Sequence, residues 1–154
     1  MTGVYDIIDK IKTFLYDHPI VNSVTFGDFK DVDIDKTTIF PLSHFLISDS
    51  SIQERTISFT VDLLFLDVID ETSEYEENDV TNRENHSNLT DVLNTQFYIA
   101  NGLITELRRG DLYDDKFQLT GNISCQPFSG RFENKLAGWS ATINIEIPNN
   151  LSVC

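Results

Sequence analysis

The sequence predicts an α+β protein in which a single antiparallel (mixed) sheet carries two helices packed on one face. Apolar residues recur at helical spacing in two segments, and in several others they alternate with polar residues at a period of two. The 154 residues, 40% of them hydrophobic, match one compact domain spanning residues 1–154. The expected order is helix, three strands, helix, two strands (α-β-β-β-α-β-β).

The first helix is expected over residues 4–18. His18 precedes Pro19, and a proline disfavours helical backbone in the residue before it, so the helix should stop there. Its apolar positions follow the spacing of one helical face: Val4, Ile7, Ile8, Ile11, Phe14 and Leu15.

Three strands should follow. Residues 23–26 alternate polar and apolar side chains up to Gly27, and residues 39–47 are apolar on both alternating faces. Pro41 indicates that this second strand starts there or lies at an edge. Residues 56–66 alternate most clearly, with one apolar and one polar face. That alternation favours antiparallel pairing, since parallel strands are usually buried on both sides.

The second helix is expected over residues 89–109, where another apolar stripe ends at Arg108, Arg109 and Gly110. Cations in the last turn followed by glycine are a favourable helix end. The preceding segment, residues 70–88, is acidic and almost devoid of apolar residues. We therefore expect an acidic mobile loop within the domain.

The last two strands are expected over residues 117–125, with a bulge at Gly121, and residues 139–147. Residues 126–138 between them would form a long hairpin loop, and long loops in compact domains are often functional.

The net negative charge of the chain argues against two classes of binding partner, nucleic acids and anionic membranes. The chain has 25 acidic and 11 basic residues, a formal net charge of -14, which repels nucleic-acid phosphates and anionic membranes. No apolar run reaches membrane-spanning length, and charges interrupt the apolar stripe at the N-terminus, unlike in a signal peptide. We expect a cytoplasm-like compartment and no membrane partner.

Metal, cofactor and catalytic motifs are not found. Cys125 and Cys154 fit neither a zinc site nor a disulfide framework. Asp31, Asp33 and Asp35 imitate the start of a calcium loop. The imitation fails because Lys36 and Leu42 replace the required glycine and glutamate, so a solvated acidic turn with at most weak Ca or Mg binding is expected. No phosphate-binding glycine loop occurs.

Histidines 18, 44 and 86 lie in no nucleophile motif, and His44, in an apolar strand, is expected to be a satisfied core or interface residue. The residues therefore form no recognisable catalytic constellation in the sequence. Two other functions stay open. A small metal-dependent hydrolase would need the three aspartates near His44. An acidic binding module would be an inhibitor that mimics DNA and works as a monomer or dimer.

Three blocks together resemble a known family: residues 18–45, residues 91–115 and residues 131–149. They are similar to the tail-completion or tail-terminator proteins (head–tail connector or neck rings) of tailed bacteriophages, especially phages of Bacteroidota. The resemblance spans nearly the whole chain, although no block is a mechanistic motif.

The resemblance implies a small α/β structural protein of the virion, with no enzyme activity and no cofactor. Such a protein assembles in the host cytoplasm as a homo-oligomeric ring, six- or twelve-fold, between the tail tube and the head or neck. Its neighbours would be tail-tube, connector or portal-side proteins. DNA would pass the lumen without specific binding, and the acidic surface would keep it from sticking.

Interface residues are expected in two segments that the sequence leaves outside the strands. One is the acidic turn with Asp28, Asp31, Asp33 and Asp35. The other is the loop around Phe128, Arg131 and Phe132, because aromatic and arginine side chains are enriched at interface centres. Alternatively, Phe128 and Phe132 close the open end of the sheet.

Overall fold

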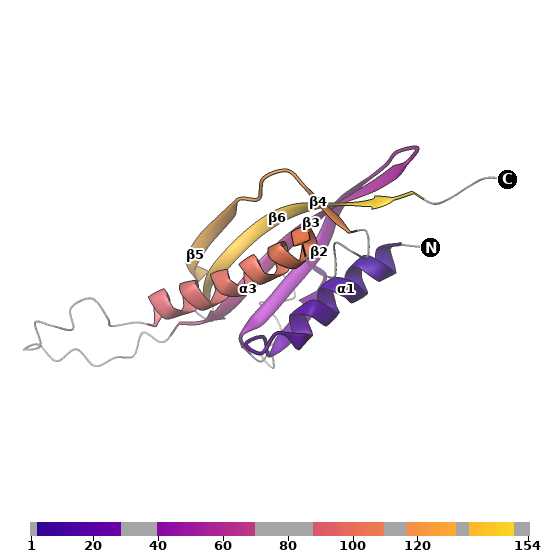
Figure 1. The fold of residues 1–154 in the computed structure, drawn as a ribbon. Coiled ribbons are helices and arrows are strands. Elements are labelled where there is room, and N and C mark those ends of the chain that lie inside the picture. The colour runs from indigo at the N-terminus through magenta and orange to yellow at the C-terminus, as the bar shows by residue number, and fades with distance from the viewer. Residues whose placement is uncertain (1–2, 29–39, 70–87, 110–116, 132–135, 150–154) are drawn as a thin grey trace, which may run out of the picture.

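The computed structural model describes residues 3–28, 40–69, 88–109, 117–131 and 136–149. Within them, two helices and six strands of one mixed sheet confirm the expected α+β class (Figure 1). In chain order the elements are α1 (Val4–Asp17), β1 (Ser23–Phe26), β2 (Leu42–Ile52), β3 (Thr56–Val68), α3 (Leu89–Arg109), β4 (Gln118–Thr120), β5 (Cys125–Arg131) and β6 (Leu136–Pro148).

The strand order is β1-β2-β3-β6-β4, and β5 also pairs with β6. The longest pairing joins β3 to β6, from Thr56 opposite Pro148 to Val68 opposite Leu136. All pairings are antiparallel except that of β1 with β2, which is parallel and makes the sheet mixed. Strand β6 therefore lies in the interior of the sheet, although it comes last in the chain.

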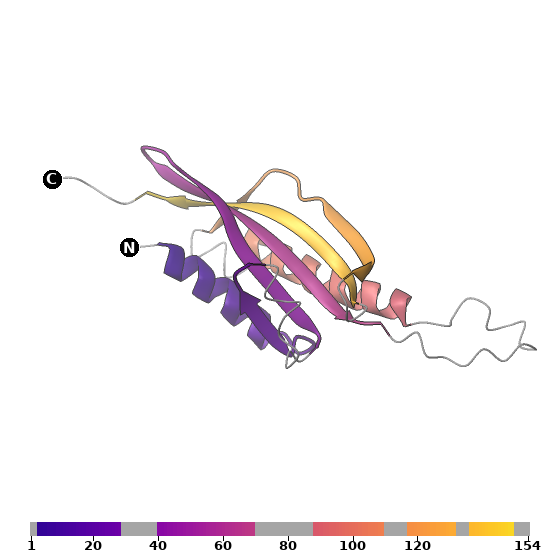
Figure 2. The same ribbon diagram turned by 180° about the vertical axis from the view of Figure 1, so that it is seen from behind.

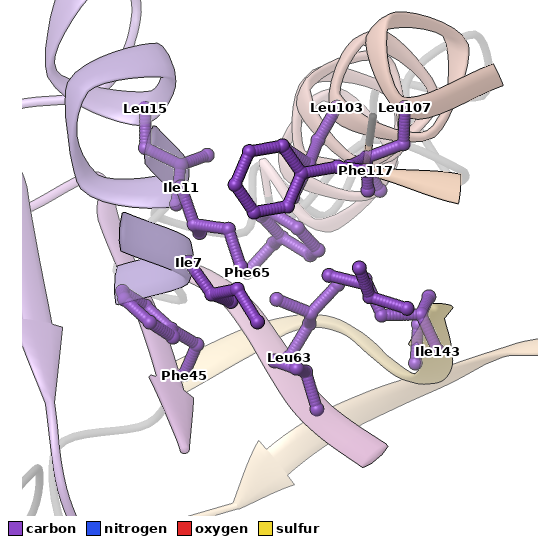
Figure 3. Close-up of a cluster of buried hydrophobic side chains, with 14 of the residues drawn as sticks. Ile7, Ile11, Leu15, Phe45, Leu63, Phe65, Leu103, Leu107, Phe117 and Ile143 are labelled. Atoms are coloured by element: carbon purple, nitrogen blue, oxygen red, sulfur yellow. The ribbon is translucent and has the colours of Figure 1, made fainter. Parts of the chain in front are cut away.

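Both helices lie over the same face of the sheet (Figures 1 and 2). Apolar side chains of both helices and of β2, β3 and β6 meet there in one core (Figure 3). Complete burial of such a side chain contributes about 1.5–3 kcal/mol. The core residues labelled in the close-up are Ile7, Ile11, Leu15, Phe45, Leu63, Phe65, Leu103, Leu107, Phe117 and Ile143.

The opposite face of the sheet has a polar half and an apolar half. In the polar half, the Thr60 hydroxyl donates to Asn144 Oδ1 at 2.9 Å, and the Thr142 hydroxyl donates to Asp62 Oδ1 at 2.7 Å. The apolar half is a second, smaller cluster consisting of Leu42, Leu64, Leu66 and Leu136, with the partly buried Phe40 and Phe128 against it.

Gly138 of β6 marks a very close approach of two strands. A Cβ atom at this position would collide with the backbone carbonyl of Phe65 on β3. Only glycine can therefore occupy the position without moving one of the two central strands.

Strand β2 is longer than predicted. It begins just after Pro41, as expected, and its first four residues, from Leu42 to Phe45, are buried, which confirms that the strand is covered on both faces there. It then continues to Ile52 through exposed serines, beyond the predicted end at residue 47. The strand extends this far because its backbone stays paired with β3, and this pairing does not depend on apolar side chains.

The predicted strand over residues 117–125 is wrong in detail. Instead of one bulged strand there are two, β4 and β5, separated at Gly121, whose φ of 78° lies in the left-handed region. The predicted loop over residues 126–138 is also wrong, because β5 runs to Arg131 and β6 begins at Leu136. Pro127 is tolerated in β5 because an edge strand can lack one N–H donor.

Candidate functional site

The sequence-predicted interface residues that the structure describes lie on opposite lateral edges of the sheet. Asp28 is exposed and follows β1, the edge strand on one side. Phe128 and Arg131 belong to β5, which lies on the other side of β6 from β3. The structure therefore does not bring Asp28 close to Phe128 or Arg131 within one chain.

The remaining predicted interface positions lie outside the described residues. They are Asp31, Asp33, Asp35 and Phe132. The acidic loop over residues 70–87 lies outside them as well.

Phe128 packs within its own chain. It pairs with Gly138 on β6 and contacts the small apolar cluster on the sheet face opposite the helices. It is half-buried, so part of the ring stays accessible. The contact supports the alternative that Phe128 closes this end of the sheet.

His44 is almost completely buried, and both of its ring nitrogens are in contact with hydrogen-bonding atoms. Nε2 lies 2.9 Å from the carbonyl oxygen of Gly27, which can only accept, so Nε2 carries a proton. Nδ1 lies 2.6 Å from Thr25 Oγ1 and can accept its hydroxyl proton. His44 is thus a satisfied core residue, as predicted, and these contacts occupy the nitrogens that a hydrolase would use.

Among the described residues, three titratable groups have clearly shifted pKa values. Burial lowers the pKa of His18, whose ring meets Tyr98 edge-on. Burial raises the pKa of the Asp67 carboxyl, and the N–H of Val68 partly offsets this by donating to it. Burial also raises the pKa of the Cys125 thiol, which disfavours the reactive thiolate.

Among the described residues, no group of three or more His, Cys, Asp or Glu side chains is placed to hold a metal ion. The described helices include none that is long and apolar enough to cross a membrane.

One lateral edge of the molecule carries exposed aromatic side chains, which we call the tyrosine edge. Tyr5 and Tyr16 of α1 are 84% and 58% exposed, and Phe26 of β1 is 41% exposed. The Tyr16 hydroxyl donates to the carbonyl of Val24 at 3.4 Å, which fixes this side of α1 beside β1. Asp9, also exposed, lies on the same side of α1, one turn after Tyr5.

The opposite edge carries two exposed arginines at the end of α3, and we call it the arginine edge. Arg108 donates from Nη2 to the carbonyl of Gly121, just after β4, at 3.2 Å, and Arg109 follows it. Sequence reasoning interpreted both arginines as a helix end only. Their position beside β4 depends on tertiary packing, which no local pattern reveals.

Searches against protein-family models and against curated proteins found no match to this chain.

Proposed function

We propose that this chain is a non-enzymatic structural protein of a tailed bacteriophage, forming a ring where the tail tube meets the head or neck. The observation that carries the proposal is the joint occurrence of residues 18–45, 91–115 and 131–149, which resemble tail-completion or tail-terminator proteins across nearly the whole chain. The neighbours of the ring would be tail-tube, connector or portal-side proteins.

Two further observations support the proposal. The one-sheet α+β architecture agrees with the small α/β protein that the resemblance implies. The sheet also has two chemically different lateral edges, and a closed ring needs two different patches on each subunit, joined head to tail.

Sedimentation velocity over a wide concentration range, with negative-stain images of any species heavier than a dimer, tests the assembly. We expect a closed ring of defined mass, and the images give its symmetry. Mass spectrometry of purified virions should also detect the chain. A protein that stays monomeric and is absent from virions would refute the proposal.

The predicted interface segment gives a second test. Replacing Arg131 and Phe132 together with alanine should abolish the ring and leave the circular dichroism spectrum native. If the double variant still assembles, this segment is not part of the interface. The ring itself is tested separately, by the sedimentation experiment on the wild type.

An acidic binding module of the DNA-mimic type is the second candidate. The observation that favours it is the strand register, which puts Asp49, Asp62 and Glu146 on the same face of the sheet. A module of this kind would remain a monomer or dimer and bind a basic nucleic-acid-binding protein with strong salt dependence. The same sedimentation experiment separates it from a ring.

A further inference from the structure

We infer that the tyrosine edge of one copy binds the arginine edge of the next copy, and that this contact joins the subunits of the ring. The inference rests on the proposed function and deepens it by naming the two patches. Each chain carries both patches, on opposite sides of one sheet. Further copies of the chain can therefore bind both patches at once, one copy at each edge.

Charge complementarity is the first argument for a second copy. Arg108 and Arg109 are exposed, and neither forms an ion pair within the part of the chain that the structure describes. Asp9 on the tyrosine edge is exposed and likewise has no cationic partner among the described residues. A carboxylate on one copy and a guanidinium on the next would form a charge-assisted, bidentate pair.

Side-chain chemistry is the second argument. Tyrosine and arginine are the residue types most enriched at the energetic centres of protein interfaces. A guanidinium also binds the face of an aromatic ring, and Tyr5 and Tyr16 are exposed on the same side of α1 as Asp9. Lys12 Nζ lies 6.0 Å from the centre of the Phe26 ring, so one aromatic ring of this edge already interacts with a cation of its own chain.

Backbone geometry is the third argument. Strand β1 pairs only with β2 and strand β4 pairs only with β6, so each leaves an outer edge unpaired by the described strands. Such edges favour association with further chains. Because β1 and β4 lie at opposite ends of the strand order, contacts through both edges run head to tail and do not end at a dimer.

A charge swap tests the contact on the full chain. Asp9→Arg and Arg109→Asp should each weaken ring assembly about tenfold or more, because each places like charges face to face; a tenfold change corresponds to about 1.4 kcal/mol. The double variant carries the opposite charges again, so assembly should return toward the wild-type level. Sedimentation velocity measures assembly, and circular dichroism checks the fold.

Matched controls change the same charges elsewhere. Glu54→Arg and Arg55→Asp both lie at the exposed tip of the β2–β3 hairpin. Both should assemble like the wild type. Tyr5→Ser removes an aromatic ring that is 84% exposed, so it should weaken assembly without affecting the fold.

The outcomes separate this inference from the proposed function. If wild-type rings form and the two single swaps leave them unchanged, or if the controls impair them equally, the inference is wrong and the ring proposal stands. If the double variant fails to recover, the pairing of Asp9 with Arg109 is wrong. A wild type that is monomeric at every concentration overturns the inference, and absence from virions then overturns the proposed function too.

Discussion

Gln96 lies within α3 with no solvent exposure, and neither its amide nitrogen nor its amide oxygen has a hydrogen-bond partner among the described residues. The Ser43 hydroxyl of β2 is likewise buried and without a partner there. Burying an amide without hydrogen bonds costs about 1–3 kcal/mol in proteins. The burial of these two polar side chains therefore lowers the stability of the fold.

Replacing Gln96 with methionine should raise the free energy of unfolding by about 1–3 kcal/mol, because a side chain of similar size no longer buries an unsatisfied amide. Urea unfolding measures the change. Gln118→Met, on an exposed position of β4, is the control and should have little effect. A less stable Gln96→Met protein would mean that the amide is satisfied in solution.

Gly138→Ala should lower the free energy of unfolding by about 3 kcal/mol, the upper end for overpacking, because the added Cβ meets the Phe65 carbonyl. Gly102→Ala in α3 is the matched comparison. Its Cβ would have ordinary contact with Phe14 Cζ at 3.7 Å, and alanine favours a helix by about 1 kcal/mol over glycine. Thermal unfolding should thus move in opposite directions for the two variants.

The pH dependence of His18 can be predicted in sign. Burial lowers its pKa below the ordinary 6.5, so the folded protein binds the proton less strongly than the unfolded chain. This contribution to stability is complete above pH 6.5 and is lost as the pH falls through 6.5 toward the folded pKa. The N–H of Ile20 donates to His18 Nδ1 at 3.3 Å, which also requires an unprotonated Nδ1.

An NMR titration of the His18 ring should give a midpoint below 6.5, and the same resonance in urea should titrate near 6.5. His18→Gln should remove this part of the pH dependence of unfolding. A folded midpoint at or above 6.5 would contradict the expected sign.

At the scale of elements, the two helices and strands β1 and β3 were predictable because burial on one side leaves a regular apolar period. In β3 this period ends at Leu63, and from there to Leu66 the strand is buried on both faces, so the expected wet face is wrong for that part. Helix α1 spans Val4–Asp17 and α3 spans Leu89–Arg109, within one residue of the expected bounds. Strand β5 was missed because Pro127, Ser129 and Gly130 resemble a loop. Its pairing with β6 is a long-range property that its own residues do not display.

Phe128 lets the role of β5 be measured. Phe128→Ala should lower the free energy of unfolding by about 1–3 kcal/mol, less than for a fully buried phenylalanine, because the ring is only partly buried against the second apolar cluster. Chemical denaturation measures the loss, with Gln126→Ala on the same face of β5 as control. An unchanged stability would contradict the closing role and favour an interface.

At the scale of the whole molecule, the net charge of -14 predicts that the protein does not bind duplex DNA at physiological salt. A gel-shift assay tests this directly. A tight, salt-sensitive complex would contradict both a passive lumen and a DNA mimic.

The candidate interface was only partly predictable from the sequence. Composition indicates which residue types favour contacts, and this drew attention to Phe128 and Arg131. It cannot show which distant residues share an edge, and so it missed Tyr16 beside β1 and Arg108 beside β4. Those positions follow from how the helices pack on the sheet.

The interior position of β6 has a consequence for synthesis on the ribosome. β6 pairs with β3, β4 and β5, yet it leaves the exit tunnel after all three of them. Until then β3 lacks its longest partner, and β4 and β5 have no strand to pair with. The sheet is therefore completed only after Pro148 has emerged, and a nascent chain stalled before residue 136 should be protease-sensitive.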